Sequence, residues 1–296
     1  MPDKNTQSPA FMHGAKWMSV PGKRNAPKGV LMGTLVAFHA HPDDESISTG
    51  GSLARASAEG HRVVLVIATN GEFGEVPQDL ADGESLIDRR RAETEKSAVV
   101  LGIHRVVWLG YKDSGMTGWE QNSDPKSFLQ APLVEAAEKL ASILREEHAD
   151  VLTVYDWHGN YGHPDHIKVN TVGHRAAEMV GVERVFEATM NRDHIVRMLE
   201  SARQAGADLG EADFDPTAGA DDGNPLGTLE AEITYAVDVS EYIHAKRESL
   251  RAHRSQITDT TFFLQMPDDA FTAGFGTEWF ILKGAEPGLR PGWLFE

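Results

Sequence analysis

The sequence contains no cysteine. Disulfide bonds, thiolate metal sites and cysteine nucleophiles are therefore excluded, and a metal ion could be held only by histidine and carboxylate side chains. No run of about 18 or more apolar residues is present, which is the length of a membrane-spanning helix. Residues 1–30 also lack a compact apolar segment that ends in a small-residue cleavage site. We expect a cytoplasmic protein without stable membrane insertion.

Basic side chains are fewer than acidic ones. The 28 lysines and arginines are outnumbered by 45 aspartates and glutamates, which gives a formal net charge of −17. A surface of this sign repels phosphate backbones and anionic membranes. We therefore expect no nucleic-acid partner; the partner that the motifs below indicate is a small-molecule substrate. The sequence leaves open whether the chain forms a homo-oligomer.

Short β-rich apolar runs alternate with segments that carry apolar residues at three- and four-residue intervals. The expected strands are 33–40, 62–69, 106–109, 150–155 and 184–189. The expected helices between them are 51–59, 85–101, 132–147 and 166–180. This alternation predicts an α/β fold whose doubly wound, mostly parallel, Rossmann-like sheet is covered by helices on both faces. Ligands of such sheets bind beyond the carboxyl ends of the strands.

The domain organisation follows from the segments that remain. Residues 1–28 show no apolar periodicity, and we expect a loose N-terminal arm there. Residues 29–296 are expected to form a single catalytic domain. Within it, 205–228 is rich in Gly, Asp and Ala and predicts a long loop or lid. A smaller C-terminal decoration follows, with strands at 233–239 and 278–282 and a helix at 240–253.

The first polar cluster is Ala-His-Pro-Asp-Asp-Glu at 40–45, directly after the first apolar strand. Three adjacent carboxylates repel one another unless a cation or a helix N-terminus neutralises them. His41 and Asp44 are spaced to face one ion across the turn, which leaves Asp43 free for proton transfer. A helix-capping turn is the alternative interpretation.

The second cluster, 155–166, follows the fourth strand and contains His163 and His166. It repeats the His-Pro-Asp triplet at an equivalent strand-to-helix junction. His41, Asp44 and His166 would form a two-histidine, one-carboxylate site that leaves positions for water and substrate, as in catalytic zinc sites. Zn2+ is therefore the expected cofactor, although Fe2+ and other divalent ions suit the same ligands.

This arrangement predicts amide hydrolysis. Zinc lowers the pKa of water and polarises a carbonyl oxygen. Asp43 would take a proton from the water and deliver it to the departing amine. His163, oriented by Asp165, and the hydroxyl of Tyr161 would stabilise the oxyanion of a tetrahedral intermediate.

Both motifs resemble those of the PIG-L/LmbE-like family of zinc-dependent de-N-acetylases. The resemblance rests on residues 40–45 and on Gly-His-Pro-Asp-His at 162–166. The family includes deacetylases of N-acetylglucosaminyl-phosphatidylinositol and of the mycothiol precursor, and mycothiol-conjugate amidases. By position it implies the zinc ligands and the base named above. It also implies that His163 is an electrostatic catalyst supported by Asp165 and Tyr161.

Further segments resemble family features around the cleft. The likeness implies that Arg90 and Asp113 bind substrate, the latter through sugar hydroxyls; a solvated helix face and a turn are the respective alternatives. Residues 69–75 resemble a loop at the cleft rim, for which a simple glycine turn is the alternative. Residues 252–256 resemble a stretch that approaches the cleft, and we favour a structural role for His253.

The expected function is zinc-dependent removal of an acyl group, N-acetyl above all, from an amino sugar or related amide. The alternatives are a mycothiol-conjugate-type amidase and a relative that binds metal or sugar without turnover. A free carboxylate at Asp43 argues against pure binding. A dinucleotide-dependent oxidoreductase is disfavoured because no Gly-x-Gly-x-x-Gly follows the first strand.

Overall fold

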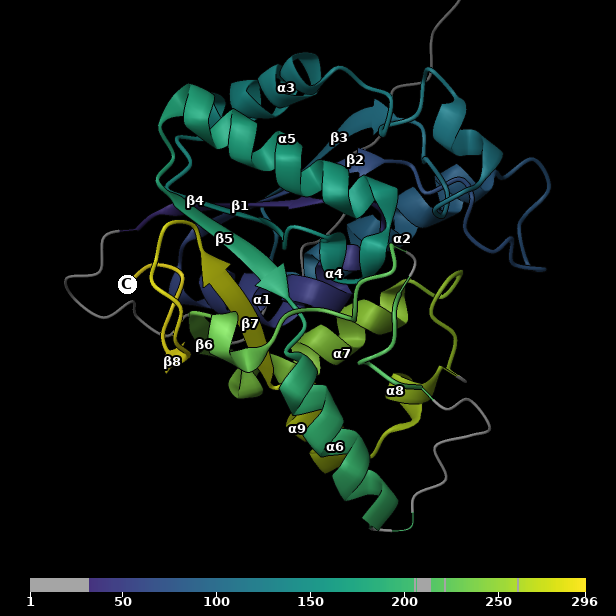
Figure 1. Ribbon diagram of the computed structural model, residues 1–296. Helices are drawn as coiled ribbons and strands as arrows, with labels where there is room; N and C mark the ends of the chain where they lie inside the picture. The colour runs from purple at the N-terminus through teal and green to yellow at the C-terminus, as the bar shows by residue number, and fades with distance from the viewer. Residues whose placement is uncertain (1–31, 205, 207–213, 221, 260) are drawn as a thin grey trace, which may run out of the picture.

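The computed structural model describes residues 32–204, 206, 214–220, 222–259 and 261–296. The arm expected over 1–28 lies outside these residues. The described chain forms one eight-stranded sheet in the order β3-β2-β1-β4-β5-β7-β6-β8 (Figure 1). The strands are β1 (Thr34–His39), β2 (Arg62–Thr69), β3 (Arg105–Tyr111), β4 (Val151–Tyr155), β5 (Arg184–Thr189), β6 (Tyr235–Asp238), β7 (Thr277–Leu282) and β8 (Arg290–Pro291).

The first five strands are parallel, and β1 lies between β2 and β4. Every residue of β1 and β4 is buried, because helices cover both faces of the sheet. The predicted α/β class with a mostly parallel, doubly wound sheet is confirmed. The C-terminal strands extend the same sheet, with β7 antiparallel to both β5 and β6.

The longer helices cover the two faces (Figure 1). On one face, α3 (Leu133–Glu146) and α5 (Pro164–Val180) pack on β1 and β4 through side chains such as Leu140 and Val169. On the other face, α1 (Gly50–Glu59) and α2 (Leu86–Leu101) contribute Leu53 and Leu101 to a second core. The helix α7 (Ile243–Ala252) packs against α1 and α2.

Local signals explain where these helices begin and end. Ser85 and Asp88 form a capping box at the start of α2, each side chain accepting the other's backbone N–H. Gly102, at φ 71°, ends that helix in the left-handed conformation. Pro164 occupies the first turn of α5, where its missing N–H has no helical partner to lose.

Sequence patterning missed several helices. The helix α6 (Arg192–Gln204) was overlooked although Ile195, Met198 and Leu199 stand at helical spacing; none of its residues is fully buried. The other missed helices are short: α4 (Gly159–Gly162), α8 (Phe262–Gln265) and α9 (Asp268–Phe275). A π-helix (Glu45–Thr49) and 3-10 turns (Glu120–Ser123, Glu230–Glu232, Ser240–Tyr242) complete the elements.

The described part of segment 205–228 consists mainly of turns. Gly219 and Pro225 form an isolated bridge, and the Gly227 N–H donates to the carbonyl of Asn160 at 2.7 Å. The end of the segment is therefore attached to the loop after β4. None of the described helices combines the length and the apolar character that a membrane crossing requires.

Candidate metal centre and active site

Two histidines converge on one carboxylate oxygen at the carboxyl ends of β1 and β4. Oδ2 of Asp44 lies 3.2 Å from Nδ1 of His41 and 3.4 Å from Nε2 of His166. These three side chains offer ligand atoms that all lie within 4.8 Å of one another. The same Asp44 oxygen accepts the backbone N–H of His41, which fixes the turn.

The surroundings of His166 test whether a cation fits. The residue is 2% exposed, and neither ring nitrogen has a hydrogen-bond partner among the described residues. A buried polar atom without a partner is costly. A divalent ion beside Asp44 would satisfy Nε2, so the donor set fits a metal such as zinc.

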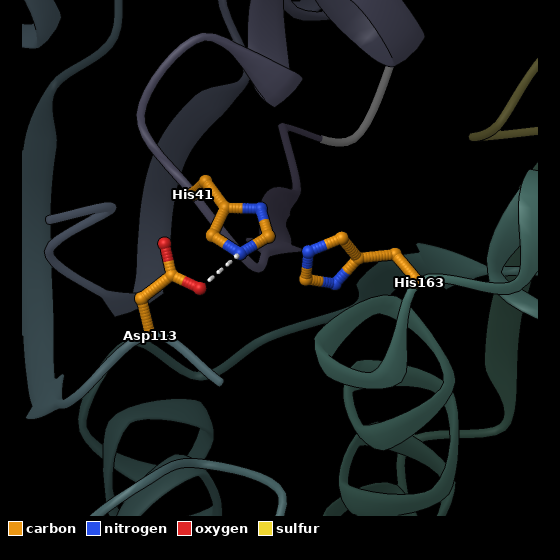
Figure 2. A group of neighbouring side chains, drawn as sticks. All are labelled: His41, Asp113 and His163. Carbon is orange, nitrogen blue, oxygen red and sulfur yellow. Dashed lines mark ion pairs between the residues drawn. The ribbon is translucent and has the colours of Figure 1, made fainter. Parts of the chain in front are cut away.

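Asp113 and His163 form a second group with His41, shown in Figure 2. Nε2 of His41 lies 3.7 Å from Oδ1 of Asp113. Nδ1 of His163, however, accepts the backbone N–H of Asp165 at 3.1 Å. A neutral His163 then carries its proton on Nε2, which makes that atom a donor instead of a metal ligand. The geometry therefore favours the group around Asp44 as the metal site.

Asp43 occupies a strained position beside this group. Its backbone φ is 93°, which is uncommon for a residue other than glycine. Its N–H donates to Glu45, and its carboxylate accepts from Arg90 at 3.2 Å. Burial raises the pKa of Asp43 to about 6, against the opposing charge of Arg90. Such a carboxyl is suited to exchanging protons near neutral pH.

Arg90, for which the family likeness implied substrate contact, lies buried beside the Asp43 turn. It is 5% exposed, and its guanidinium donates to the carbonyls of Gly71 and Pro42, each at 2.6 Å. These bonds hold the turn that carries Asp43 against the loop after β2. Arg90 is buried because it lies on the inward face of α2. The alternative of a solvated helix face is therefore wrong.

Asp113 is also buried and faces the histidines. Its Oδ1 accepts the Gly115 N–H at 2.8 Å. Burial alone would raise the pKa of this carboxyl, but His41 and the hydrogen bonds hold it well below its usual range. It is therefore an ionised acceptor beside His41 and His163.

The sequence interpretation expected Asp165 to orient His163. In the structure the Asp165 carboxylate points to other partners. The carboxylate accepts from the N–H of Ser114 at 2.9 Å and from its hydroxyl, and it lies 3.2 Å from Nε2 of His41. Only its backbone N–H reaches His163. Tyr161 packs edge-on to His163 and His166, with ring centroids 6.1 Å and 5.0 Å away respectively.

Two residues of the site were missed by sequence reasoning. Tyr155 stacks on His166 with centroids 4.2 Å apart, and its hydroxyl lies 2.9 Å from Nδ1 of His39. Ser114 holds Asp165 in place. The roles of Tyr155 and Ser114 depend on contacts between segments that are distant in the sequence. The sequence indicated them only by their position near the carboxyl end of an apolar strand.

A doubly wound sheet that gathers two histidines and a carboxylate at its strand ends is an arrangement that can hold a catalytic metal ion. Residues 36–177 match the family model described as PIG-L: GlcNAc-PI de-N-acetylase. The chain belongs to this PIG-L family of deacetylases, which is the family that its motifs predicted.

Two relatives of the chain carry the same name. Proteins of Thermobispora bispora and Saccharomonospora viridis, each 37% identical, are named 1D-myo-inositol 2-acetamido-2-deoxy-alpha-D-glucopyranoside deacetylase. The alignments cover 86% of this chain and 90% and 97% of those proteins. A solved deacetylase from the biosynthesis pathway of teicoplanin shares the fold, with a TM-score of 0.55 at 18% identity over 86% of this chain and all of that chain (100%).

Proposed function

We propose that this enzyme is a zinc-dependent deacetylase that removes the N-acetyl group of an amino sugar. His41, Asp44 and His166 hold the metal. The observation that carries the proposal is the buried Asp44 oxygen shared by two histidine nitrogens, one of which belongs to a ring without hydrogen-bond partners among the described residues.

The reaction adds water to the acetyl carbonyl carbon and breaks the carbon–nitrogen bond, giving acetate and the free amine. The metal would supply Lewis-acid polarisation of the carbonyl and a lower pKa for water. Asp43 takes the proton from the attacking water and passes it to the amine nitrogen as that group departs. Nε2–H of His163 and the hydroxyl of Tyr161 donate to the oxyanion formed in between.

The remaining polar residues have two different roles. Asp113 accepts from a sugar hydroxyl, because its ionised carboxylate lies beside His41 and His163. Arg90 holds the Asp43 turn through two carbonyls and one carboxylate, and this replaces the sugar contact implied by family resemblance. Asp165 orients His41.

The names of the relatives support a narrower substrate class. Their name specifies a glucosamine N-acetylated and joined to myo-inositol, and identity of 37% extends over nearly their whole length. We therefore propose an N-acetylglucosaminyl glycoside of this kind as the substrate.

A panel of amides tests the proposal. Zinc-loaded enzyme would be offered N-acetylglucosaminyl-inositol, free N-acetylglucosamine, an N-acetylated alkylamine and an S-conjugate of N-acetylcysteinyl-glucosaminyl-inositol, and released amine would be measured with fluorescamine. We expect the inositol glycoside to exceed the alkylamine at least about tenfold in kcat/KM, because unpaired polar groups penalise a substrate without hydroxyls.

Variants sharpen the same assay. Asp43→Asn should retain its metal and lose about 10²–10⁴-fold in kcat, the usual contribution of general acid–base catalysis. Asp79→Asn is the control, since that side chain is 80% exposed. Equal rates on sugar and alkylamine would remove the sugar assignment, and faster cleavage of the S-conjugate would identify an amidase. Absence of amine from every substrate would overturn the proposal.

A further inference from the structure

A buried chain of polar contacts connects the C-terminal end of α7 to Asp43. Nε2 of His253 lies 2.6 Å from Oε1 of Glu45, and Oε2 of Glu45 accepts the backbone N–H of Asp43 at 3.1 Å. His253 is 1% exposed and Glu45 is fully buried. The two residues are 208 positions apart in the sequence.

The turn at Asp43 depends on such contacts. A non-glycine residue at φ 93° is strained and keeps this conformation only when its surroundings impose it. Arg90 holds the turn from the α2 side through Pro42 and the Asp43 carboxylate. Glu45 is the partner of the Asp43 N–H, so the position of the Glu45 carboxylate fixes the direction of the turn.

Glu45 is itself fixed by donors. Oε1 receives the hydroxyl of Ser97 at 2.6 Å and the hydroxyl of Ser46 at 3.0 Å in addition to His253. A buried carboxylate needs a cationic partner to stay ionised without a large penalty. Burial alone would lower the pKa of His253, but the charge and hydrogen bond of Glu45 raise it. Together with Ser97 and Ser46, His253 therefore holds the Glu45 carboxylate in place through hydrogen bonds.

The residues after His253 fix its own position. Ser255 donates to Glu93 on α2 through its N–H at 2.9 Å and its hydroxyl at 2.6 Å. Gln256 exchanges two hydrogen bonds with the backbone of Glu75 in the loop after β2. Since α7 also packs against α2 (Figure 1), the turn at 253–256 is anchored to elements that surround Asp43.

We propose that His253 is a positioning residue for catalysis, which acts through Glu45 to hold Asp43 in the orientation that receives the proton of water. His253 lies outside residues 36–177, the part of the chain that matches the family model. The inference rests on the proposed function, because it assigns to Asp43 the role of base.

A merely structural histidine would act differently. Loss of a buried ion pair lowers stability, and kcat would then fall only in proportion to the folded fraction. Loss of a positioning contact lowers kcat of the folded, metal-loaded enzyme and leaves KM nearly unchanged, since His253 is buried away from solvent. A misplacement of about 1 Å at a reacting group can cost about 10²-fold in rate.

The experiment compares His253→Ala and His253→Gln with His61→Ala in the full-length, zinc-loaded enzyme. His61 is a matched control because it is equally buried, accepts the Gly33 N–H and stacks on Phe295, away from Asp43. The measurements are kcat, KM, zinc content and Tm. We expect His253→Ala to lose about 10- to 100-fold in kcat with KM within about threefold and zinc retained. His253→Gln, which keeps an N–H donor, should recover part of this loss.

A double-mutant cycle separates positioning of Asp43 from a general loss of stability. In an Asp43→Asn background His253→Ala should lower kcat no further, because the base that it positions is gone. His61→Ala should leave kcat within about twofold of wild type.

Equal kcat in folded wild type and His253→Ala, or the same loss in the presence and absence of Asp43, would overturn this inference alone. If His253→Ala does not fold, His253→Gln and Ser97→Ala decide by the same cycle. Wild-type enzyme that releases no amine would instead overturn the proposed function.

Discussion

The carboxylate of Asp165 lies 3.2 Å from Nε2 of His41, the ring nitrogen that faces away from the shared oxygen of Asp44. A carboxylate at this position keeps the proton on Nε2 and leaves the lone pair of Nδ1 for a metal. Ser114 holds the carboxylate from the other side with two donors. The loop after β3 therefore contacts the candidate metal group through Asp165.

The first prediction concerns this pair. Asp165→Asn should weaken zinc binding about 10- to 100-fold, because the amide no longer fixes the tautomer of His41. Competition with a chelator measures the change. Asp156→Asn is the control, since Asp156 is equally buried at the end of β4 and hydrogen-bonds to Thr189 and Asn160. Equal zinc affinity in Asp165→Asn and wild type would exclude the proposed orientation of His41.

The second prediction separates the two groups that share His41. His166→Ala should lose the bound metal, whereas His163→Ala should retain about one equivalent, because Nδ1 of His163 is occupied by the Asp165 N–H. Elemental analysis of the purified variants decides between them. Retention by His166→Ala together with loss from His163→Ala would move the metal to the Asp113 side.

The third prediction concerns stability far from the site. Glu147 accepts hydrogen bonds from Arg62 and from Arg105 at the amino ends of β2 and β3. The Arg62 hydrogen bond, against the effect of burial and with help from Arg105, lowers the pKa of Glu147 to about 2. A lowered carboxyl pKa contributes stability that is fully present above the unfolded value and is lost as pH falls through the folded value.

Glu147→Gln should therefore lower Tm at pH 7 by about 2 °C, for a loss of about 1 kcal/mol discounted for the water-exposed arginines. The difference from wild type should shrink as the pH falls from about 4.5 to about 2. Calorimetry with a chelator present removes any contribution from metal release. Glu138→Gln, at an exposed pair with Arg145, should show no resolvable change. A difference that persists unchanged at low pH would contradict the assignment.

The features that the sequence predicted are those encoded by short, contiguous patterns of residues. The parallel strands follow from apolar runs of matching length, and His41, Asp44 and His166 follow from motifs that begin where two of those strands end. The direction of a side chain was not accessible in this way. Asp165 follows His163 by two residues, yet its carboxylate turns toward His41, because Ser114 of a different loop supplies the donors.

Long-range partners were the other limit. In the sequence, Glu45 is one of three adjacent carboxylates that we interpreted as neighbours of a metal. Its contact with His253 forms only when α7 packs against the site. Such partners depend on tertiary contacts between distant segments, which a local pattern does not encode.

The last prediction concerns Arg90, for which the family likeness and the geometry give different outcomes. If its guanidinium bound the sugar, its removal would raise KM, since a substrate contact made before the reaction would be lost. The structure instead directs it to the carbonyls of Gly71 and Pro42 and to Asp43, with 5% of the residue exposed. Arg90→Met keeps much of the side-chain volume and should lower kcat at least about tenfold with KM within about threefold, because the base loses its orientation.

Arg91→Met is the matched control for this variant. The neighbouring arginine donates to Asn70 and lies over the ring of Trp108 without a contact to the Asp43 turn. Steady-state kinetics on the zinc-loaded enzymes give kcat and KM separately, and elemental analysis excludes metal loss as the cause. We expect Arg91→Met to match wild type in both constants. A rise in KM with kcat unchanged in Arg90→Met would instead support the sugar contact. The N-terminal end of α2 would then have to move when substrate binds.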